Sequence, residues 1–215
     1  MEIYLSEEER VEALKKWWKE NAKAVMVGVA LGLAIIAGWN AWKGSQRVKA
    51  EEASSLYQQL LKAVEAKQTE PATKLSERLI EQFQGTPYAT YGTLFLARLK
   101  VQGGDLAGAK KALQDLSASV KDDSLKHLAR VRLVRVMRAM GESEGALQLI
   151  APLSRDKMGE FESLYEELKG DLYADLHRPD DARLAYEKAR QLGESSPMLE
   201  VKINDLAAPP AQPAS

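Results

Sequence analysis

The chain has 215 residues, with 30 Lys and Arg against 31 Asp and Glu, and it contains no cysteine. The formal charge of -1 gives no electrostatic basis for a nucleic-acid partner. The lack of cysteine excludes disulfides, thiol catalysis and cysteine-ligated metals, and it leaves the compartment open.

Residues 1–23 form a charged N-terminal segment, and the pattern over 1–21 predicts a short amphipathic helix. Ser6 is a suitable N-cap, and Glu9 follows three residues later in the position of a capping box. Apolar side chains recur on one face of this helix, which suits the headgroup region of a membrane. A solvated charged leader is the alternative interpretation.

The next segment, Ala24 to Trp42, has nineteen residues without a charge. As a helix it would extend about 28 Å, close to the thickness of the hydrocarbon core of a bilayer. Trp39 and Trp42 suit the interfacial region at its end. We therefore predict a transmembrane helix over 24–42, with a buried helix of a soluble core as the alternative. No small-residue cleavage site follows it, and so we expect an uncleaved signal-anchor.

Positive charges flank this span on both sides. Five Lys and Arg lie in the twenty residues before Ala24, and four lie in the twenty residues after Trp42. This difference favours a cytoplasmic N-terminus by a single charge, so charge alone does not fix the orientation.

Small residues recur every fourth position of the span, at Ala24, Gly28 and Gly32. This spacing lets a second transmembrane helix approach closely. We expect this row to be a docking face for a membrane partner. A homodimer of the chain would use the same row.

Beyond Trp42 the apolar pattern predicts short amphipathic helices and no strands. Asp105 is expected to cap one helix, and Ser196-Pro197 to begin another. Residues 207–215 are rich in proline and are expected to be a disordered tail. The expected helices cover residues 46–67, 71–84, 88–102, 105–119, 122–140, 142–153, 158–176, 179–192 and 197–206.

An internal repeat runs through these helices. Alanines that follow a predicted turn stand at Ala72, Ala109, Ala146 and Ala182, with separations of 37, 37 and 36 residues. A fixed period of this length indicates stacked helix-turn-helix units. The turn residues Gly104, Gly141 and His177 each lie five residues before their alanine.

The last unit resembles a tetratricopeptide repeat in its alternation of small and large side chains. Gly170 and Tyr173 occupy its first helix, and Ala182, Tyr186 and Ala189 its second. The predicted fold class is therefore all-α, with one N-terminal transmembrane helix followed by a tetratricopeptide-like α-solenoid of helix hairpins.

We find no catalytic constellation in the sequence. His127 and His177 lie fifty residues apart without a metal-ligand spacing, and we interpret both as surface or packing residues. Glu166 and Glu167 are expected on the solvated edge of a helix. The sequence thus predicts no cofactor and no enzyme activity, since a carboxylate hydrolase would need paired acids in a pocket.

Arginines recur at equivalent places on the first helices of two successive units, at Arg98 and Arg135. In tetratricopeptide-like stacks the first helices line a concave groove that receives peptides. Guanidinium groups beside aromatic rings can hold the carboxylates or carbonyls of an extended chain. A solvated helix face is the alternative. The candidate groove comprises Tyr57, Tyr91, Leu94, Arg98, Val131, Arg135 and Arg138.

As a whole, the chain resembles the YfgM family, the single-span bacterial inner-membrane proteins described as ancillary subunits of the Sec translocon. The resemblance is strongest over residues 1–42, in the opening Met-Glu-Ile-Tyr and in the exit pattern Gly38-Trp39-x-x-Trp42. It returns at 198–206, where Lys-Ile-Asn-Asp-Leu looks like the end of the family pattern. The proline-rich tail departs from that pattern, as does the aromatic pair Trp17-Trp18.

This resemblance implies cytoplasmic residues 1–23, a span over 24–42 and a periplasmic repeat domain over 43–206. It also implies association with the SecYEG channel in the lipid bilayer and with a periplasmic chaperone of the PpiD prolyl-isomerase type. The groove would then hold that chaperone or emerging secretory polypeptides. A membrane-anchored scaffold for cell-division or cell-wall machinery is the alternative from another class.

Overall fold

The structure is a computed structural model that describes residues 7–193 and 198–206. The predicted cap at Ser6, the helix start at Ser196-Pro197 and the predicted disordered tail lie outside the described residues. The chain divides into two compact units, Met1–Glu52 and Ala53–Ser215, which we call the anchor unit and the repeat domain.

The anchor unit consists of one helix, α1 (Glu7–Glu65), which continues into the repeat domain. Separate helices predicted over 1–21, 24–42 and 46–67 are therefore wrong as to their ends. The reason is local, because the segment between them has no proline and its glycines stand singly, so nothing stops the helix. The domain boundary predicted after Trp42 accordingly lies inside α1.

In the region of α1 over residues 24–42, apolar side chains point outward on every side. Ile35 is 71% exposed and Met26 is 68% exposed, and the most apolar window of the helix has no buried part. This is the one helix in the described chain that is long and apolar enough to cross a membrane. A helix that is apolar all round and uncovered by protein is typical of a membrane span.

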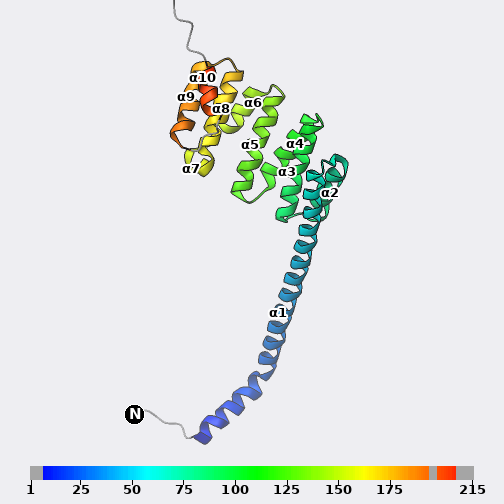
Figure 1. The fold of residues 1–215 in the computed structure, drawn as a ribbon. Helices are drawn as coiled ribbons and strands as arrows, with labels where there is room; N and C mark the ends of the chain where they lie inside the picture. Colours follow the sequence, from blue (N-terminus) through cyan, green and yellow to red (C-terminus); the bar gives the residue numbers. More distant parts are fainter. Residues whose placement is uncertain (1–6, 194–197, 207–215) are drawn as a thin grey trace, which may run out of the picture. The chain divides into compact units, whose positions relative to one another are not determined.

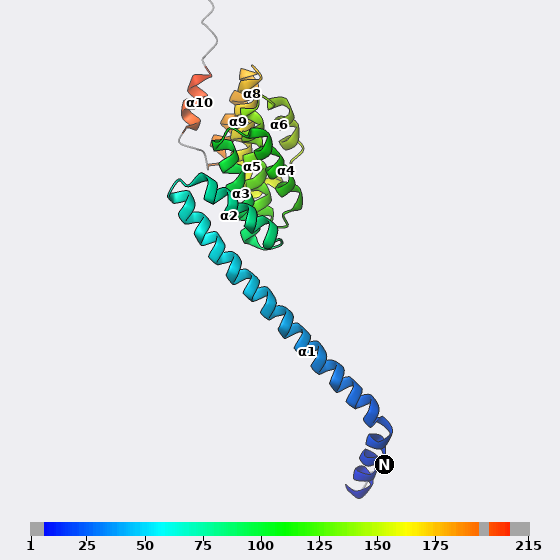
Figure 2. The same ribbon diagram turned by 90° about the vertical axis from the view of Figure 1, so that its right-hand side faces the viewer.

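The repeat domain is built of helix hairpins that stack side by side, as Figures 1 and 2 show. The end of α1 begins the stack, and the described residues contain helices and no strands, which confirms the predicted all-α class. The following helices are α2 (Thr69–Gln82), α3 (Pro87–Gln102), α4 (Leu106–Ser119), α5 (Asp123–Ala139), α6 (Ser143–Ile150), α8 (Glu162–Asp175), α9 (Pro179–Gln191) and α10 (Leu199–Asp205).

One connection is more elaborate than the sequence predicted. The helix expected over 158–176 begins only at Glu162, because the short α7 (Arg155–Met158) and the 3-10 turn η1 (Gly159–Phe161) precede it. Gly159 adopts a φ of 51°, which an ordinary helix cannot contain, and so it separates α7 from η1. Asp105 caps α4 as predicted, since its side chain accepts a hydrogen bond of 2.8 Å from the Gly108 amide.

All four hairpins turn in the same way. The residue five positions before each repeat alanine has a left-handed backbone, with φ of 55° at Lys67, 81° at Gly104, 76° at Gly141 and 56° at His177. The next amide donates to the carbonyl five residues earlier, the hydrogen bond of a Schellman motif. These bonds join Gln68 to Ala63, Asp105 to Lys100, Glu142 to Met137 and Arg178 to Tyr173, at 2.8 to 2.9 Å.

Close contact between the two helices of a hairpin depends on small residues. The repeat alanines Ala72, Ala109, Ala146 and Ala182 are all 0% exposed. In the last unit, a Cβ added at Gly170 would lie 2.3 Å from the ring of Tyr186, so only glycine fits there. The small and large positions read from the sequence thus form the contacts between paired helices.

Helix α8 corrects the expectation for Glu166 and Glu167, which are buried rather than solvated. They are 4% and 7% exposed. Lys169 and Lys188 each approach Glu166 at 2.9 Å, and Lys202 approaches Glu167 at 2.7 Å. A buried carboxylate costs little when it is paired in this way. The error arose because two of the pairing cations, Lys188 and Lys202, come from helices that lie later in the sequence.

Asp171, one turn further along α8, joins four helices. It is 6% exposed and accepts from Arg138 of α5 at 3.1 Å, from Tyr186 of α9 at 2.8 Å and from Lys202 of α10 at 2.8 Å. Burial raises the pKa of Tyr186, and the hydrogen bond to Asp171 raises it further. The Tyr186 hydroxyl therefore keeps its proton at ordinary pH and donates a hydrogen bond to the Asp171 carboxylate.

We expect His177→Gly to stabilise the repeat domain by about 0.5–1 kcal/mol. A left-handed backbone costs an ordinary residue about 1–2 kcal/mol, and the larger entropy of glycine in the unfolded chain removes about 0.4–1 kcal/mol of that gain. Urea unfolding of the full-length protein in detergent, followed by circular dichroism at 222 nm, measures the change. Tryptophan fluorescence is unsuitable because all four tryptophans lie in α1.

Gly141→Ala is the matched control at the equivalent turn. It should destabilise the domain by about 1–2 kcal/mol, since alanine would have to adopt a φ of 76°. If both variants changed the free energy of unfolding in the same direction, the left-handed backbone at these turns would not explain the effect of either substitution.

Candidate functional site

One face of α3 carries aromatic side chains that pack against the end of α1. Tyr88, Tyr91 and Phe95 follow one another at intervals of three and four residues, which places them on one side of the helix. The Tyr57 ring lies 5.7, 5.5 and 6.1 Å from these three rings, measured between centroids. All four side chains are half-buried, so each keeps part of its ring open to solvent. We call these four residues the aromatic cluster.

Three arginines lie next along the same face. Arg98 follows Phe95 by three residues on α3, and Arg132 and Arg135 come from α5. Arg132 donates to the Leu94 carbonyl at 3.4 Å, which brings it within one turn of Arg98. Burial lowers the pKa of Arg132, and the positive charges of Arg98 and Arg135 lower it further. We call these three residues the arginine cluster.

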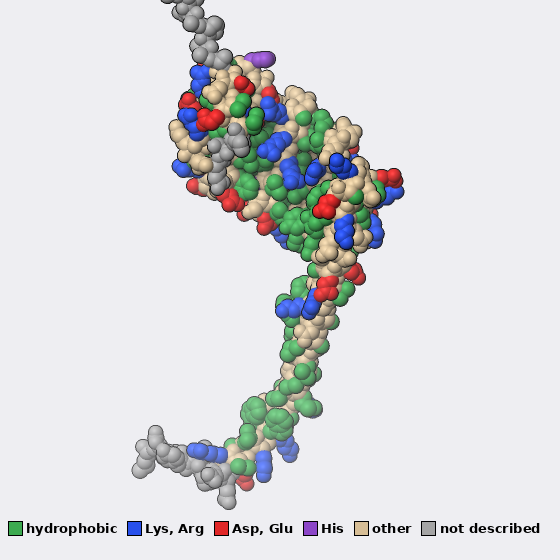
Figure 3. Space-filling model, viewed as in Figure 1, with side chains coloured by type: hydrophobic (Ala, Val, Ile, Leu, Met, Phe, Trp, Pro, Cys, Tyr) green, Lys and Arg blue, Asp and Glu red, His purple; other side chains and the backbone are tan. Residues whose placement is uncertain are grey.

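This cluster lacks compensating charge. In the part of the chain whose side chains are described, residues 9–193 and 198–206, no carboxylate lies within ion-pair distance of Arg98, Arg132 or Arg135. Figure 3 shows hydrophobic side chains gathered where the end of α1 meets α3, with Lys and Arg side chains beside them over α3 and α5. The surface thus combines open aromatic rings with uncompensated positive charge.

The structure brings together part of the groove predicted from sequence. Tyr57, Tyr91, Arg98 and Arg135 lie at this surface. Leu94 and Val131 do not, since they are 4% and 2% exposed and belong to the core.

Arg138 also lies elsewhere, facing α8. Its guanidinium donates to the Asp175 carboxylate at 2.7 and 3.0 Å, and this bond raises the pKa of Arg138. Burial alone would raise the pKa of Asp175, but the bonds from Arg138 and Ser143 outweigh it and lower the pKa. Arg138 is thus held within the domain.

Sequence reasoning missed Tyr88 and Phe95 of the aromatic cluster and Arg132 of the arginine cluster. Arg132 stands three positions before Arg135, and so the signal was present as an i, i+3 pair of like charges. The sequence alone did not decide between Arg132 and Arg138, which lie on either side of Arg135.

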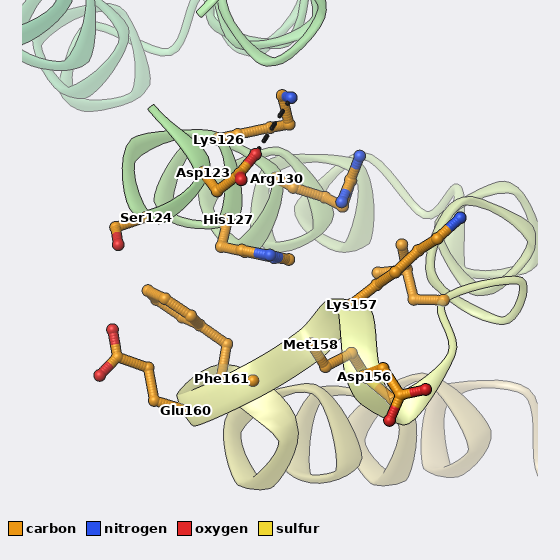
Figure 4. Close-up of a pocket in the computed structure, with 12 residues that line it drawn as sticks. Asp123, Ser124, Lys126, His127, Arg130, Asp156, Lys157, Met158, Glu160 and Phe161 are labelled. Carbon is orange, nitrogen blue, oxygen red and sulfur yellow. Dashed lines mark hydrogen bonds and ion pairs between the residues drawn. The ribbon is translucent and has the colours of Figure 1, made fainter. Parts of the chain in front are cut away.

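A second feature is a hollow of about 750 Å³ between the start of α5 and the α7–η1 connection. Figure 4 shows His127 and Phe161 turned toward one another at its floor. Their rings stack at 5.0 Å with an angle of 22° between planes. His127 is 9% exposed, so the predicted packing role suits it.

His127 links three elements through hydrogen bonds. Its Nδ1 lies 2.9 Å from the Tyr165 hydroxyl of α8, and its other nitrogen bonds to the Lys157 carbonyl of α7. Arg130 in turn donates to Tyr165. The bonds are all satisfied when His127 is neutral, with its proton toward Lys157 and the Tyr165 hydroxyl donating to Nδ1. Burial and the charge of Arg130 lower the pKa of His127, which favours this neutral form.

Metal binding finds no support in the described side chains, among which no group of three or more His, Asp or Glu is arranged to hold an ion. The aromatic and arginine clusters offer apolar rings and guanidinium groups, whose chemistry suits binding of a polypeptide chain.

Comparison with known proteins agrees with the architecture. A family model for a tetratricopeptide repeat-like domain matches residues 15–208. A protein of Escherichia coli K12 named ancillary SecYEG translocon subunit is 30% identical over 210 residues, which cover 96% of this chain and 100% of that protein. The chain belongs to the YfgM family.

Other members of the YfgM family show the same full-length match. Proteins with the same name from Haemophilus influenzae and Aggregatibacter actinomycetemcomitans are 28% and 26% identical, each over 96% of this chain and 100% of their own length. The family name and the single candidate span in α1 fit a protein of the inner membrane. The tetratricopeptide-like fold and the resemblance to the YfgM family are thus both confirmed.

For this YfgM-family protein we expect stability of the repeat domain to fall as the pH falls below about 6.5. An unfolded histidine takes up a proton near that pH, whereas folded His127 does so only at lower pH, so the unfolded state binds more protons in between. The slope contributed by one proton is at most about 1.4 kcal/mol per pH unit. Urea unfolding at pH 7, 6 and 5 measures it.

His127→Gln should flatten this pH dependence, whatever its effect on stability at pH 7. The control is His177→Gln, at an exposed turn position, which should leave the slope as it is. Equal slopes for the wild type and His127→Gln would contradict the neutral assignment.

Proposed function

We propose that this protein is a non-enzymatic ancillary subunit of the Sec translocon, anchored in the bacterial inner membrane by residues 24–42. Its N-terminal residues 1–23 would be cytoplasmic and its repeat domain periplasmic. The observation that carries the proposal is the match over the full length of proteins named ancillary SecYEG translocon subunits. A span that is apolar all round and followed by a stack of hairpins supports it.

In this proposal the repeat domain binds a PpiD-type periplasmic chaperone, emerging secretory polypeptides, or both. The aromatic and arginine clusters supply a surface with the chemistry for chain binding, since tyrosine rings offer apolar contact and guanidinium groups bind carboxylates and carbonyls. Membrane anchoring raises the effective concentration of the domain near a partner in the same bilayer, so weak individual contacts suffice.

The span would contribute through its row of small residues, Ala24, Gly28 and Gly32. A Cβ placed at Gly28 or Gly32 meets nothing within 4 Å in the single chain, so both positions are open to a neighbouring helix. Packing of backbones at such positions is the main source of affinity between transmembrane helices. We therefore propose that this row docks on a helix of the SecYEG channel.

Affinity purification of the full-length protein from native membranes in mild detergent tests the function directly. We expect mass spectrometry to find SecYEG and a PpiD-type chaperone above the level of a control in which 24–42 is replaced by an unrelated span. Recovery of division or wall-synthesis proteins without the channel would overturn the secretion function.

Gly28→Leu combined with Gly32→Leu should lower recovery of the channel, because two large side chains would keep the partner helix away. The matched control is Ala30→Leu with Ala37→Leu, which places two leucines on the opposite side of the helix at about 100° per residue. Equal recovery with both double variants would refute docking through this row.

A further inference from the structure

We propose that the aromatic and arginine clusters form one binding site for an acidic polypeptide segment. Carboxylates of the segment bind the arginine cluster, and an apolar or aromatic side chain close by in the segment packs on the aromatic cluster. This inference rests on the proposed function, in which the repeat domain binds polypeptide, and it names the chemistry of the segment that this surface selects.

The first argument is charge. Elsewhere in the domain, several cations pair with carboxylates: Arg138 with Asp175, Lys188 with Glu166, and Lys202 with Glu167. The arginine cluster brings three positive charges together, and no carboxylate of the described side chains lies within ion-pair distance of them. Like charges in partly desolvated surroundings repel one another, so an anion that binds there relieves a cost already present in the free protein.

The second argument is geometry. Arg132 is half-buried and held by the Leu94 carbonyl, whereas Arg98 on α3 and Arg135 on α5 are exposed on either side of it. A fixed central guanidinium flanked by two free ones can meet carboxylates from both sides. Bonds between arginine and carboxylate are charge-assisted and frequently bidentate, which makes them directional as well as strong.

The third argument is the distance between the two clusters. Phe95 lies three residues before Arg98 on α3, and Tyr88 lies ten residues before it. At 1.5 Å per residue these separations along the helix are about 4.5 and 15 Å. An extended chain advances about 3.3 Å per residue, so an acid seated on the arginines puts side chains two to five positions away over the rings. The preferred segment therefore has an aromatic or large apolar residue within about five positions of its acids.

Fluorescence anisotropy with designed peptides tests this inference on the full-length protein in a neutral detergent. The probe is a labelled twelve-residue Gly/Ser peptide that carries two adjacent Glu and a Phe four positions before them. One matched peptide replaces both Glu with Gln, and another replaces Phe with Ser. We expect the Gln peptide to bind at least tenfold more weakly, and the Ser peptide also to lose affinity.

Variants of the protein locate the site. Arg132→Gln should weaken binding of the Glu peptide about tenfold or more and should reduce its dependence on salt, because a charged contact is lost. The matched control is Arg78→Gln, which removes an exposed arginine of α2 that has no ion pair in the described chain and should leave affinity unchanged. Circular dichroism confirms that both variants are folded.

Three results would overturn the inference: equal affinity for the Glu and Gln peptides, an equal loss from Arg78→Gln and Arg132→Gln, or binding of phosphatidylglycerol vesicles with no binding of the Glu peptide. Failure of the proposed function gives a different result. The protein would then bind the Glu peptide through Arg132 but would not recover SecYEG from membranes.

Discussion

The stack of hairpins depends on an alanine without exposed surface in the second helix of each unit. Because this residue is small, the second helix of each hairpin can approach the first closely, and the large side chains that follow are buried between the two helices. The four alanines are Ala72, Ala109, Ala146 and Ala182. A larger residue there would force the pair apart, at a typical cost of about 1–3 kcal/mol. Because each hairpin contacts only its neighbours, this one spacing is transmitted along the whole array.

Charges are used in two opposite ways along this array. In α8 they are internal, since the buried carboxylates of Glu166, Glu167 and Asp171 each have a cation from another helix. At the arginine cluster, by contrast, the positive charges have no carboxylate within ion-pair distance among the described side chains. Pairing these arginines with carboxylates would favour local stability, because the like charges repel one another. Surfaces that retain such unrelieved charge are typical of binding sites.

The repeat could be predicted from sequence because its determinants are local. The alanine, the turn residue five positions before it and the apolar positions after it all lie within one hairpin, so a fixed period makes them visible. Lys67 lacked the glycine signal, so that only the structure shows, through its φ and the Gln68–Ala63 hydrogen bond, that the first turn is of the same kind.

The partners of charged side chains could not be predicted in the same way. Arg138 meets Asp171 across 33 residues of chain and Lys202 meets Glu167 across 35, and no pattern within a helix encodes such a pairing. Of the seven residues predicted for the groove, four therefore lie at one surface, whereas Arg138 pairs with α8. Arg132 lies at that surface although it had not been predicted there. The helix ends predicted within α1 were wrong for another reason. An amphipathic stretch and an apolar stretch can follow one another in a single helix when no residue between them stops it.

The stack ends at α10. Leu199 is 1% exposed against the apolar face formed by Ala182, Tyr186 and Ala189, and Lys202 fixes the helix to α8. Helix α10 therefore covers the apolar face that these three residues of α9 form, which is the role of a terminal cap. Duplication of a hairpin could lengthen this protein only by insertion between existing units, because a unit added after α10 would find its docking face already covered. The closed end thus restricts how the array can grow in evolution, and it protects the domain from stacking end to end with its own copies.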